Sequence, residues 1–438
     1  MNNLRQNFNK YKNSPLVKGT LILTIASFIT RIIGFLFRIF LTHKIGAEGL
    51  GIYQLIFPIQ LVCYAISCSG VELAISRLTA AHKSCQYLKY GLLISLLAGI
   101  FCSIFIYVFA PYICTNIIFE PRCENLIRVL AFMIPFSCIH ACISSYFIGR
   151  KQVRITALGQ MIEQISRVLA ITFFIYLFEY LDLFVSPLCA VLGSLCGEIC
   201  STIFCILKFY FHSNSCKGAV QSNEKTHYFT EILTLSVPVT LNRLMLSILQ
   251  SIQSVLIPSM LILYGLSSKE SLEIYGILLG LVLPFLLFPG ALINAYSTLL
   301  LPEISKAQSC NDLKKIKRTT KKTIYFCSIF GMLCSFLFIV FGNLFGIYLL
   351  HSKMAGTFVC ELGIVCPFIY LNQTLSSIVN GLGKTGITFL LGTFCTVLQI
   401  LLIVKLMPAI GIAGYIISFF VTNALNSVLL FGYVYKKV

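Results

Sequence analysis

The sequence predicts an all-α integral membrane protein with about twelve transmembrane helices. Of its 438 residues, 58% are hydrophobic and only 11% are charged, whereas a soluble domain carries roughly 25% charged residues. Apolar runs close to the ~20 residues that cross a ~30 Å hydrocarbon core recur along the whole chain. The runs are continuous rather than alternating, which favours helices over a transmembrane barrel.

The expected spans are separated by short breaks where Pro, Gly and charged residues cluster. One break is the segment 119–122 and another is 265–269. The predicted spans are 17–42, 50–75, 88–110, 126–148, 158–180, 185–207, 232–257, 273–300, 323–350, 356–380, 386–406 and 410–435.

Lys and Arg concentrate on one side of this arrangement, in the N-terminal tail, the loops after the even-numbered spans and the C-terminus. The bias predicts a cell-membrane protein with both termini in the cytoplasm. The net charge of +18 therefore reflects topology rather than nucleic-acid binding. The basic stretch 1–18 is expected to be a cytoplasmic tail, not a signal peptide. The segment 302–322 is the strongest evidence for this topology, and we interpret it as a solvated cytoplasmic loop that faces the lipid headgroups. Its basic residues are Lys306, Lys314, Lys315, Lys317, Arg318, Lys321 and Lys322.

An internal repeat relates the two halves of the chain. It is clearest in three matches: Pro135-Phe136 with Pro367-Phe368, Gly149 with Gly381, and Phe57-Pro58 with Phe288-Pro289. With about six helices in each half, both copies have the same orientation. We expect two six-helix lobes, 1–211 and 231–438, joined by a polar cytoplasmic linker, 212–230. In transporters built this way the substrate binds between the lobes.

Arginines within the predicted spans are the first candidates for a binding site, because each costs roughly 2.5–3.5 kcal/mol at the bilayer centre. Arg31 and Arg38 lie about two turns apart on one face of the first span. Arg31 is expected to face a water-filled cavity. For Arg38, snorkelling towards the membrane surface is an equally good interpretation.

The seventh span carries a polar stripe that includes Arg243 and Gln250, with Asn242 beside it. Hydrogen bonds between helices explain the amides but not the arginine, so the stripe predicts a cavity wall. In the fifth span Glu163 precedes Arg167 by one turn, the favourable order for an intrahelical pair. A structural pair and a substrate-facing pair are equally consistent with this spacing.

The remaining polar residues of the spans suggest no catalytic, cofactor or metal site. Glu72 and Glu198 are isolated acids, and His140 is interpreted as a packed core residue. The 19 cysteines lie mostly in apolar runs without a Cys-x-x-Cys pair and are interpreted as packing residues. Arginines outnumber acids within the spans, and guanidinium groups bind phosphate bidentately and stay charged. An anionic cargo is therefore expected.

Several segments of the chain are together characteristic of one family. They are Phe28 to Phe35, Ile45 to Gln54, Ala74 to Arg77, Phe288-Pro289 and Leu300 to Glu303. In these segments the chain resembles the stage V sporulation protein B group of the multidrug/oligosaccharidyl-lipid/polysaccharide exporter superfamily. The resemblance covers essentially the whole chain. It implies a V-shaped pair of lobes, alternating access, and an undecaprenyl-pyrophosphate-linked saccharide as cargo, destined for peptidoglycan, spore cortex or surface polysaccharide.

The implied partners are this lipid-linked anionic saccharide and membrane lipids, with a coupling ion as a further candidate. No nucleic acid and no cofactor are expected, and the protein is expected to act as a monomer. The lipid II flippase of the same superfamily has an Arg-x-x-Gly-Phe motif in its first helix, which maps onto Arg31, Gly34 and Phe35. Its arginine in the eighth helix is replaced by Pro284 here, and Arg243 is the hypothetical substitute.

A multidrug antiporter and a membrane-embedded glycosyltransferase are the alternatives to a flippase. A multidrug antiporter coupled to H⁺ or Na⁺ on the same scaffold needs an intramembrane carboxylate, for which Glu72, Glu163 and Glu198 are available. A membrane-embedded glycosyltransferase is disfavoured because the sequence predicts no cluster of acids. The flippase is the leading hypothesis.

Overall fold

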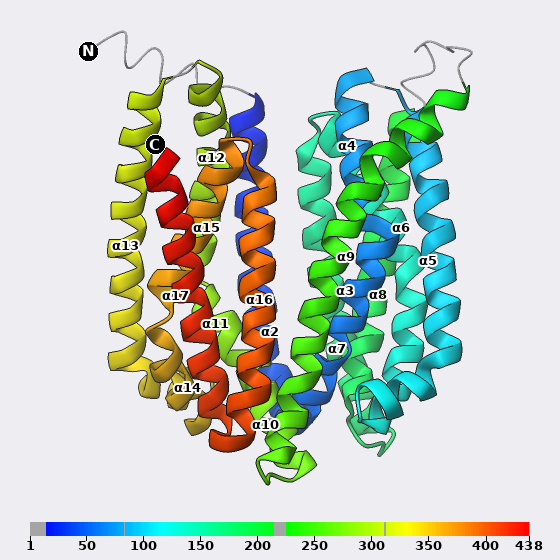
Figure 1. Ribbon diagram of the computed structural model, residues 1–438. Coiled ribbons are helices and arrows are strands. Elements are labelled where there is room, and N and C mark those ends of the chain that lie inside the picture. The colour runs from blue at the N-terminus through cyan, green and yellow to red at the C-terminus, as the bar shows by residue number, and fades with distance from the viewer. Residues whose placement is uncertain (1–14, 83, 214–224, 311, 438) are drawn as a thin grey trace. The chain divides into compact units, whose positions relative to one another are not determined.

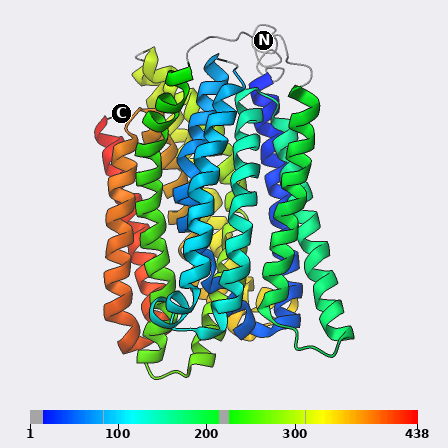
Figure 2. The ribbon, with the colours of Figure 1, turned by 90° about the vertical axis from the view of Figure 1, so that its right-hand side faces the viewer.

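The computed structural model describes residues 15–82, 84–213, 225–310 and 312–437. These residues form helices and contain no strand, so the predicted all-α class is confirmed. The chain divides into two compact units, Met1–Ser251 and Ile252–Val438, and each is a bundle of long helices (Figures 1 and 2). Most of the predicted cytoplasmic tail, residues 1–14, lies outside the described part of the chain.

The first unit is built from the helices that precede α10. In chain order they are α2 (Pro15–Leu55), α3 (Phe57–Tyr64), η1 (Ala65–Ser69), α4 (Gly70–His82), α5 (Gln86–Tyr112), η2 (Ile113–Ile117), η3 (Pro121–Cys123), α6 (Glu124–Gly149), α7 (Val153–Tyr180), α8 (Pro187–Ser213) and the larger part of α9 (Lys225–Leu263).

The second unit takes up the end of α9 and continues to the C-terminus. Its further elements are α10 (Ser268–Tyr275), η5 (Gly276–Val282), α11 (Leu283–Leu287), α12 (Gly290–Ser309), α13 (Leu313–Leu344), η6 (Phe345–Leu349), α14 (Lys353–Gly363), α15 (Cys366–Gly381), α16 (Thr385–Ile410) and α17 (Ile412–Lys437). The last two pack side by side (Figure 1).

Ten helices in the described residues are long and apolar enough to cross a membrane, or eleven if the bent pair α14–α15 is one span. Each of the roughly twelve predicted spans has a counterpart among them. The counts differ because the first candidate, Ile22–His82, is a continuous run of 61 residues that covers two predicted spans. At 1.5 Å per residue it would extend about 90 Å, so it is long enough for two crossings.

The first two predicted spans meet at Gly46, where α2 bends. Gly46 has a φ of 74°, a left-handed conformation that glycine adopts without the clash a Cβ atom would cause. The break expected between residues 42 and 50 therefore falls at a bend within α2.

Local irregularities recur at matching places in the two units. A π-helix interrupts the second predicted span (η1) and the eighth (η5), and another ends the third (η2) and the ninth (η6). A Cβ at Gly149 would lie 2.6 Å from the Ser76 carbonyl oxygen, and one at the matching Gly381 would lie 3.1 Å from the Leu301 carbonyl oxygen. Glycine permits such close helix contacts. The recurrence agrees with the repeat seen in the sequence.

The first part of α9 belongs to the core of the first unit. Ile232 of α9 is buried in a cluster with Ile75, Tyr146 and Phe147, and α9 runs alongside α3 and α4 (Figures 1 and 2). A Cβ at Gly70 would lie 2.3 Å from the Ser236 carbonyl oxygen, so α4 and α9 are in close contact. This packing explains why the unit boundary falls at residue 251, within α9.

The predicted linker 212–230 stays a prediction, because residues 214–224 lie outside the described part. Helix α8 extends to Ser213 and α9 begins at Lys225, so the ends of the predicted linker are helical. The second unit has its own core, in which α12, α15 and α17 contribute Ile304, Ile378 and Leu430.

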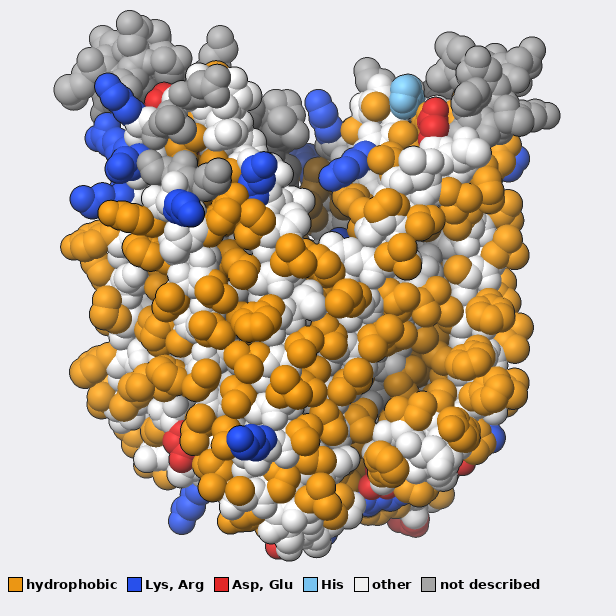
Figure 3. All heavy atoms as spheres, in the orientation of Figure 1, with side chains coloured by type: hydrophobic (Ala, Val, Ile, Leu, Met, Phe, Trp, Pro, Cys, Tyr) orange, Lys and Arg blue, Asp and Glu red, His pale blue; other side chains and the backbone are white. Residues whose placement is uncertain are grey.

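Surface side chains divide into an apolar band and basic ends. Hydrophobic side chains cover the middle of each unit, and Lys and Arg gather at the end of the second unit where α12 and α13 meet (Figure 3). The predicted loop 302–322 is mostly helical, in the end of α12 and the start of α13, and its seven basic side chains are exposed. This distribution is the one expected of a multi-pass membrane protein.

Candidate functional site

Helices α7 and α8 pack in close contact because α8 carries a Gly-x-x-x-Gly pattern. A Cβ at Gly193 would lie 2.7 Å from the backbone nitrogen of Ile171, and one at Gly197 would lie 2.8 Å from the carbonyl oxygen of Glu163. Small residues allow membrane helices to approach this closely. Glu198 follows Gly197 directly, so the close contact brings two acidic residues of different helices together.

Four ionisable side chains gather at this contact: His140 from α6, Glu163 and Arg167 from α7, and Glu198 from α8. Nη2 of Arg167 contacts Oε1 of Glu163. Nδ1 of His140 lies 3.6 Å from Oε1 of Glu198 and 3.9 Å from Oε2 of Glu163. The structure thus forms the intrahelical Glu163–Arg167 pair and makes it part of a larger group, which we call the polar cluster.

The polar cluster resembles a set of metal ligands in its spacing. The candidate ligand atoms of His140, Glu163 and Glu198 lie within 4.8 Å of one another. The guanidinium group of Arg167 already occupies one oxygen of Glu163, however, and supplies positive charge at that point. We therefore assign no metal ligand here.

Two arginines of different helices interact electrostatically beside the polar cluster. Arg38 on α2 acts on Arg167 on α7, and both act on Tyr53. This position favours the interior of the first unit over snorkelling for Arg38. Two like charges held together in an apolar bundle create a favourable place for an anion.

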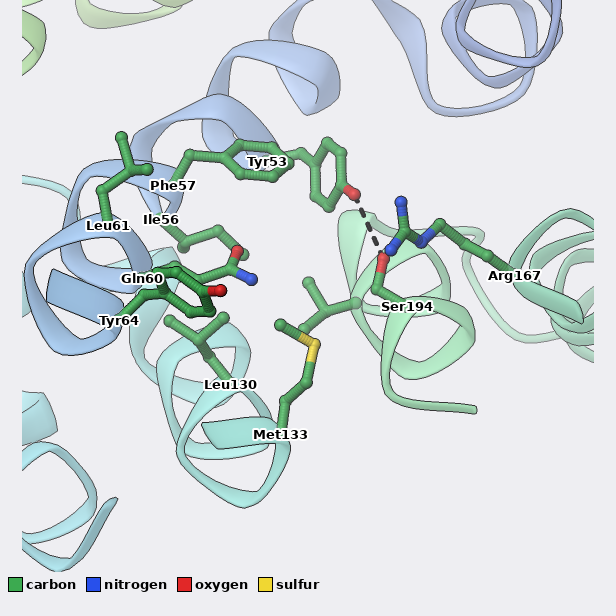
Figure 4. Close-up of a pocket in the computed structure, with 11 residues that line it drawn as sticks. Tyr53, Ile56, Phe57, Gln60, Leu61, Tyr64, Leu130, Met133, Arg167 and Ser194 are labelled. Atoms are coloured by element: carbon green, nitrogen blue, oxygen red, sulfur yellow. Dashed lines mark hydrogen bonds between the residues drawn. The ribbon is translucent and has the colours of Figure 1, made fainter. Parts of the chain in front are cut away.

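A pocket of about 240 Å³ opens beside Arg167, within the first unit (Figure 4). On one side Tyr53 and Ser194 share a hydrogen bond of 3.3 Å, and Tyr64 lies on the other side. The volume is below the roughly 300–1,000 Å³ of a site for a whole small molecule, so the pocket fits a small group such as a phosphate. It is lined by Tyr53, Ile56, Phe57, Gln60, Leu61, Tyr64, Leu130, Met133, Arg167, Val191 and Ser194.

The polar face of α2 packs along α7. Ser27 donates a hydrogen bond of 3.4 Å to Gln160, and a Cβ at Gly34 would lie 3.1 Å from Nε2 of Gln164. Arg31 belongs to the same face of α2 but is exposed. Among the described residues it has no ion-pair partner. The structure therefore places Arg38 beside the polar cluster and leaves Arg31 on the surface of the unit.

Arg243 on α9 is paired with a residue that seemed isolated in the sequence. Its Nη1 lies 3.0 Å from Oε1 of Glu72, and Tyr64 donates a hydrogen bond of 2.7 Å to the other oxygen of Glu72. Asn242 and Gln250 are exposed on the same helix. Because Tyr64 also lines the pocket beside Arg167, one residue joins the Glu72–Arg243 pair to the pocket.

Sequence reasoning missed the roles of His140 and Glu198 in this arrangement. His140 was interpreted as a packed core residue, and it is buried, but it lies between two carboxylates. The available signal was the spacing of Ser137, His140 and Ser144 on α6, which puts three polar residues on one helical face. All three are buried, so this face lines the polar interior of the unit.

Solved structures of transporters have the same architecture. A multidrug resistance MATE family transporter of the MOP superfamily, in an inward-facing conformation, superposes with a TM-score of 0.70 at 15% identity, covering 93% of this chain and 94% of that one. A MOP superfamily transporter from Pyrococcus furiosus, reported with a binding pocket of reverse polarity, gives a TM-score of 0.67 at 14% identity, covering 97% and 96%. The fold is thus that of a MOP superfamily transporter.

Residues 16–308 match the family described as polysaccharide biosynthesis protein, and the chain belongs to this family. Stage V sporulation protein B of Bacillus subtilis is 23% identical over 95% of this chain and 90% of its own length. The lipid II flippase MurJ of the same organism is 22% identical over 93% of this chain and 81% of its own length.

Proposed function

We propose that the protein is a flippase that moves a polyprenyl-pyrophosphate-linked saccharide from the cytoplasmic to the outer leaflet of the cell membrane. Family membership, the transporter fold and the names of two relatives support this assignment. The relatives are flippases or sporulation proteins rather than enzymes by name, which supports transport without catalysis. The cargo would be a precursor of peptidoglycan, spore cortex or surface polysaccharide.

The observation that carries the proposal is the pocket of phosphate size beside Arg167, together with the electrostatic interaction of Arg167 with a second arginine, Arg38. A pyrophosphate offers each guanidinium a bidentate partner, and its negative charge relieves the repulsion between the two arginines. Tyr53 and Ser194 supply hydroxyl groups at the same place. The pocket is too small for the saccharide, so the sugar would lie outside it.

The pair Glu72–Arg243 fits the same function. Arg243 is 47% exposed and is held through one nitrogen by a carboxylate, an anion that a phosphate oxygen can replace. In the empty protein Glu72 therefore acts as an internal stand-in for an anionic headgroup. The exposed amides of Asn242 and Gln250 extend the polar face of α9 with groups able to bind sugar hydroxyls.

The membrane potential is sufficient as a driving force for this export. An inside-negative potential drives anions outward with ~2.3 kcal/mol per charge per 100 mV. Export of a pyrophosphate-bearing lipid therefore needs no nucleotide, provided that the arginines compensate the charge during passage. The alternating access implied by the family would expose the site to each side in turn.

The proposal is tested by flipping of a fluorescent polyprenyl-diphosphate saccharide in proteoliposomes. We expect Arg38→Gln and Arg167→Gln each to slow flipping by roughly 10- to 100-fold, because a hydrogen bond to a charged group is worth ~1.5–3 kcal/mol. The matched control is Arg154→Gln, an exposed arginine on the same helix as Arg167, which should flip normally. Unchanged flipping by both site variants would refute the assignment.

A coupled multidrug antiporter on this fold is the second candidate, and the carboxylates Glu163 and Glu198 beside each other favour it. We rank the antiporter second because a cationic drug would be repelled by Arg38 and Arg167. Drug resistance in cells that overproduce the protein, lost in a Glu198→Gln variant, would reverse this ranking.

A further inference from the structure

A second cavity lies on the surface of the first unit, between helices α5 and α8, with α6 as its floor. Helix α6 packs against both α5 and α8, and a space of about 490 Å³ lies between the three helices. We call this space the lateral groove. Its apolar lining consists of Leu88 and Leu92 of α5, Ile139 and Ile143 of α6, and Ile206 and Phe209 of α8. The volume is within the roughly 300–1,000 Å³ of ligand sites, so the groove can hold a hydrocarbon segment.

The lateral groove is separate from the pocket beside Arg167. Both cavities use α6, but the pocket is lined by Leu130 and Met133 and the groove by Ile139 and Ile143. At about 3.6 residues per turn these two pairs lie on different sides of α6. The two cavities share no lining residue. An occupant of the groove therefore need not be the transported molecule.

Aromatic and polar contacts fix the three helices to one another behind the lateral groove. Sγ of Cys85, at the start of α5, lies 3.1 Å from the hydroxyl oxygen of Tyr146 on α6. The ring of Phe209 on α8 packs edge-on against the same tyrosine, with 5.5 Å between the ring centroids. Tyr146 is buried in one cluster with Leu88 and Ile143. The groove is therefore a fixed feature of the first unit.

The lateral groove lies near the ends of the helices that form it. Leu88 and Leu92 belong to the first two turns of α5, and Ile206 and Phe209 to the last two turns of α8. The connections at this end follow the second, fourth and sixth predicted spans, which the charge distribution assigns to the cytoplasm. With this topology the groove opens at the level of the lipid headgroups of the cytoplasmic leaflet.

Basic side chains surround the lateral groove at this end. Lys89 lines the groove and is exposed. Nζ of Lys208 on α8 lies 5.8 Å from the centroid of the Phe204 ring, and Cζ of Arg150 lies 5.9 Å from the centroid of the Tyr146 ring. Among the described residues, neither Lys89 nor Lys208 has an ion-pair partner. Positive charge beside an apolar groove complements a molecule with an anionic head and a hydrocarbon chain.

We propose that the lateral groove binds one anionic phospholipid of the cytoplasmic leaflet, of the phosphatidylglycerol type. The first part of an acyl chain lies between α5 and α8, and the phosphate group lies at Lys89 and Lys208, whose ammonium groups bind phosphate as point charges. The proposed cargo fits less well, because its pyrophosphate is assigned to the pocket beside Arg167, on another side of α6. The phospholipid site does not depend on the proposed function.

The lipid preference is tested by native mass spectrometry of the full chain, with phosphatidylglycerol and phosphatidylcholine that carry the same acyl chains. We expect wild type to bind phosphatidylglycerol more tightly. Lys89→Gln/Lys208→Gln should weaken this binding by roughly 25-fold, about fivefold for each lysine, and leave phosphatidylcholine unaffected. The matched control, Lys314→Gln/Lys317→Gln, removes the same charge from exposed positions on α13 and should keep the preference. An equal loss in the control would overturn the proposal, because charge anywhere on the protein would then suffice.

The location is tested in nanodiscs with phosphatidylglycerol that carries a photoreactive diazirine in its acyl chain. We expect crosslinks to the groove segments of α5, α6 and α8. They should be lost in Ile206→Trp, whose ring fills the groove from a position that is 44% exposed. Leu207→Trp, at the next residue, is 50% exposed and outside the lining, and should keep them. Equal crosslinking of both tryptophan variants would overturn the proposal.

Two other occupants would give different results. If undecaprenyl diphosphate displaced the crosslinked phospholipid from the groove, the groove would be assigned to the cargo. A dimer in the mass spectrum that is lost in Ile206→Trp but kept in Leu207→Trp would assign the groove to a second copy of the chain. Either result would overturn the phospholipid site. The flippase proposal is tested separately, because these variants leave Arg38 and Arg167 unchanged.

Discussion

At the scale of single residues, two arginines of the first unit form ion pairs with carboxylates. Arg167 is held by Glu163 and Arg243 by Glu72, so neither cation is left without a counter-charge in an apolar bundle. A cation with an internal partner is stable in the empty protein and still able to exchange that partner for a phosphate. Because the anion must displace the carboxylate, a paired arginine binds an anion less tightly than an unpaired arginine does.

We expect Glu72→Gln to bind farnesyl diphosphate more tightly than wild type, because the amide no longer competes for Arg243. The pair is half exposed, and exposed pairs are worth ~0.2–1 kcal/mol, so the gain should be at most about fivefold. Calorimetry at a fixed pH measures it. Glu361→Gln, an exposed acid in the second unit, is the control. A weaker affinity in Glu72→Gln would mean that Glu72 helps to bind the ligand.

The site residues could be predicted from the sequence only in part. An arginine within a membrane span is costly wherever it occurs, so Arg38, Arg167 and Arg243 were recognisable as candidates. The partner of Arg167 was predictable, because Glu163 lies one turn before it on the same helix. The partner of Arg243 was not, since Glu72 lies five predicted spans earlier, and neither was the approach of Glu198, two spans after His140. Helical spacing shows which residues share a face but not which helix that face contacts.

At the scale of helices, the candidate site depends on the close contact of α7 with α8. Gly197 lies against the backbone of Glu163 and the side chain of Arg167. Any larger residue here pushes apart the two helices that hold the polar cluster. The site and the packing of these helices are therefore linked at one position.

We expect Gly197→Ala to lower the stability of the protein and to weaken binding of farnesyl diphosphate. The new methyl group would meet the Glu163 carbonyl oxygen at 2.8 Å, and overpacking of this kind costs typically 1–3 kcal/mol. Thermal unfolding in detergent measures the loss. Gly392→Ala on α16, where a Cβ would have nothing within 4 Å, should be as stable as wild type. Equal melting of both variants would contradict the packing described for α7 and α8.

The positions of the membrane-spanning helices were predictable, because hydropathy alone decides which segments enter the membrane. It was not predictable that α9 packs mainly in the first unit. The sequence suggested that the seventh span begins the second lobe, but Ile232 and Ser236 pack in the first unit. Polar composition indicates where a loop can be. The boundary between the units depends on side-chain packing, which cannot be inferred from a local sequence pattern. The break between the first two predicted spans was predictable, and it falls at Gly46, where the backbone is not helical.

At the scale of the whole molecule, orientation in the membrane is a prediction from charge. Cys310 is exposed at the end of α12, within the basic segment 302–322. We expect a membrane-impermeant maleimide to label Cys310 in inverted vesicles but not in intact cells, because that loop is assigned to the cytoplasm. Labelling is measured relative to Cys310→Ser.

A second cysteine checks the opposite side. In the Cys310→Ser background, Lys269→Cys places a thiol at an exposed position in the first turn of helix α10, at the end that the topology assigns to the outside. This variant should react in intact cells. Labelling of Cys310 from outside, or of Lys269→Cys only from inside, would invert the topology and with it the direction of transport.

The most direct test of the central claim is the affinity of the purified protein for undecaprenyl diphosphate compared with uncharged undecaprenol. We expect the diphosphate to bind at least tenfold more tightly in wild type, because only the charged head engages Arg38 and Arg167. In the double variant Arg38→Gln/Arg167→Gln this preference should disappear, with binding of undecaprenol unchanged. Equal affinity of wild type for both lipids, or a preference that survives in the double variant, would contradict the claim that these arginines bind the headgroup.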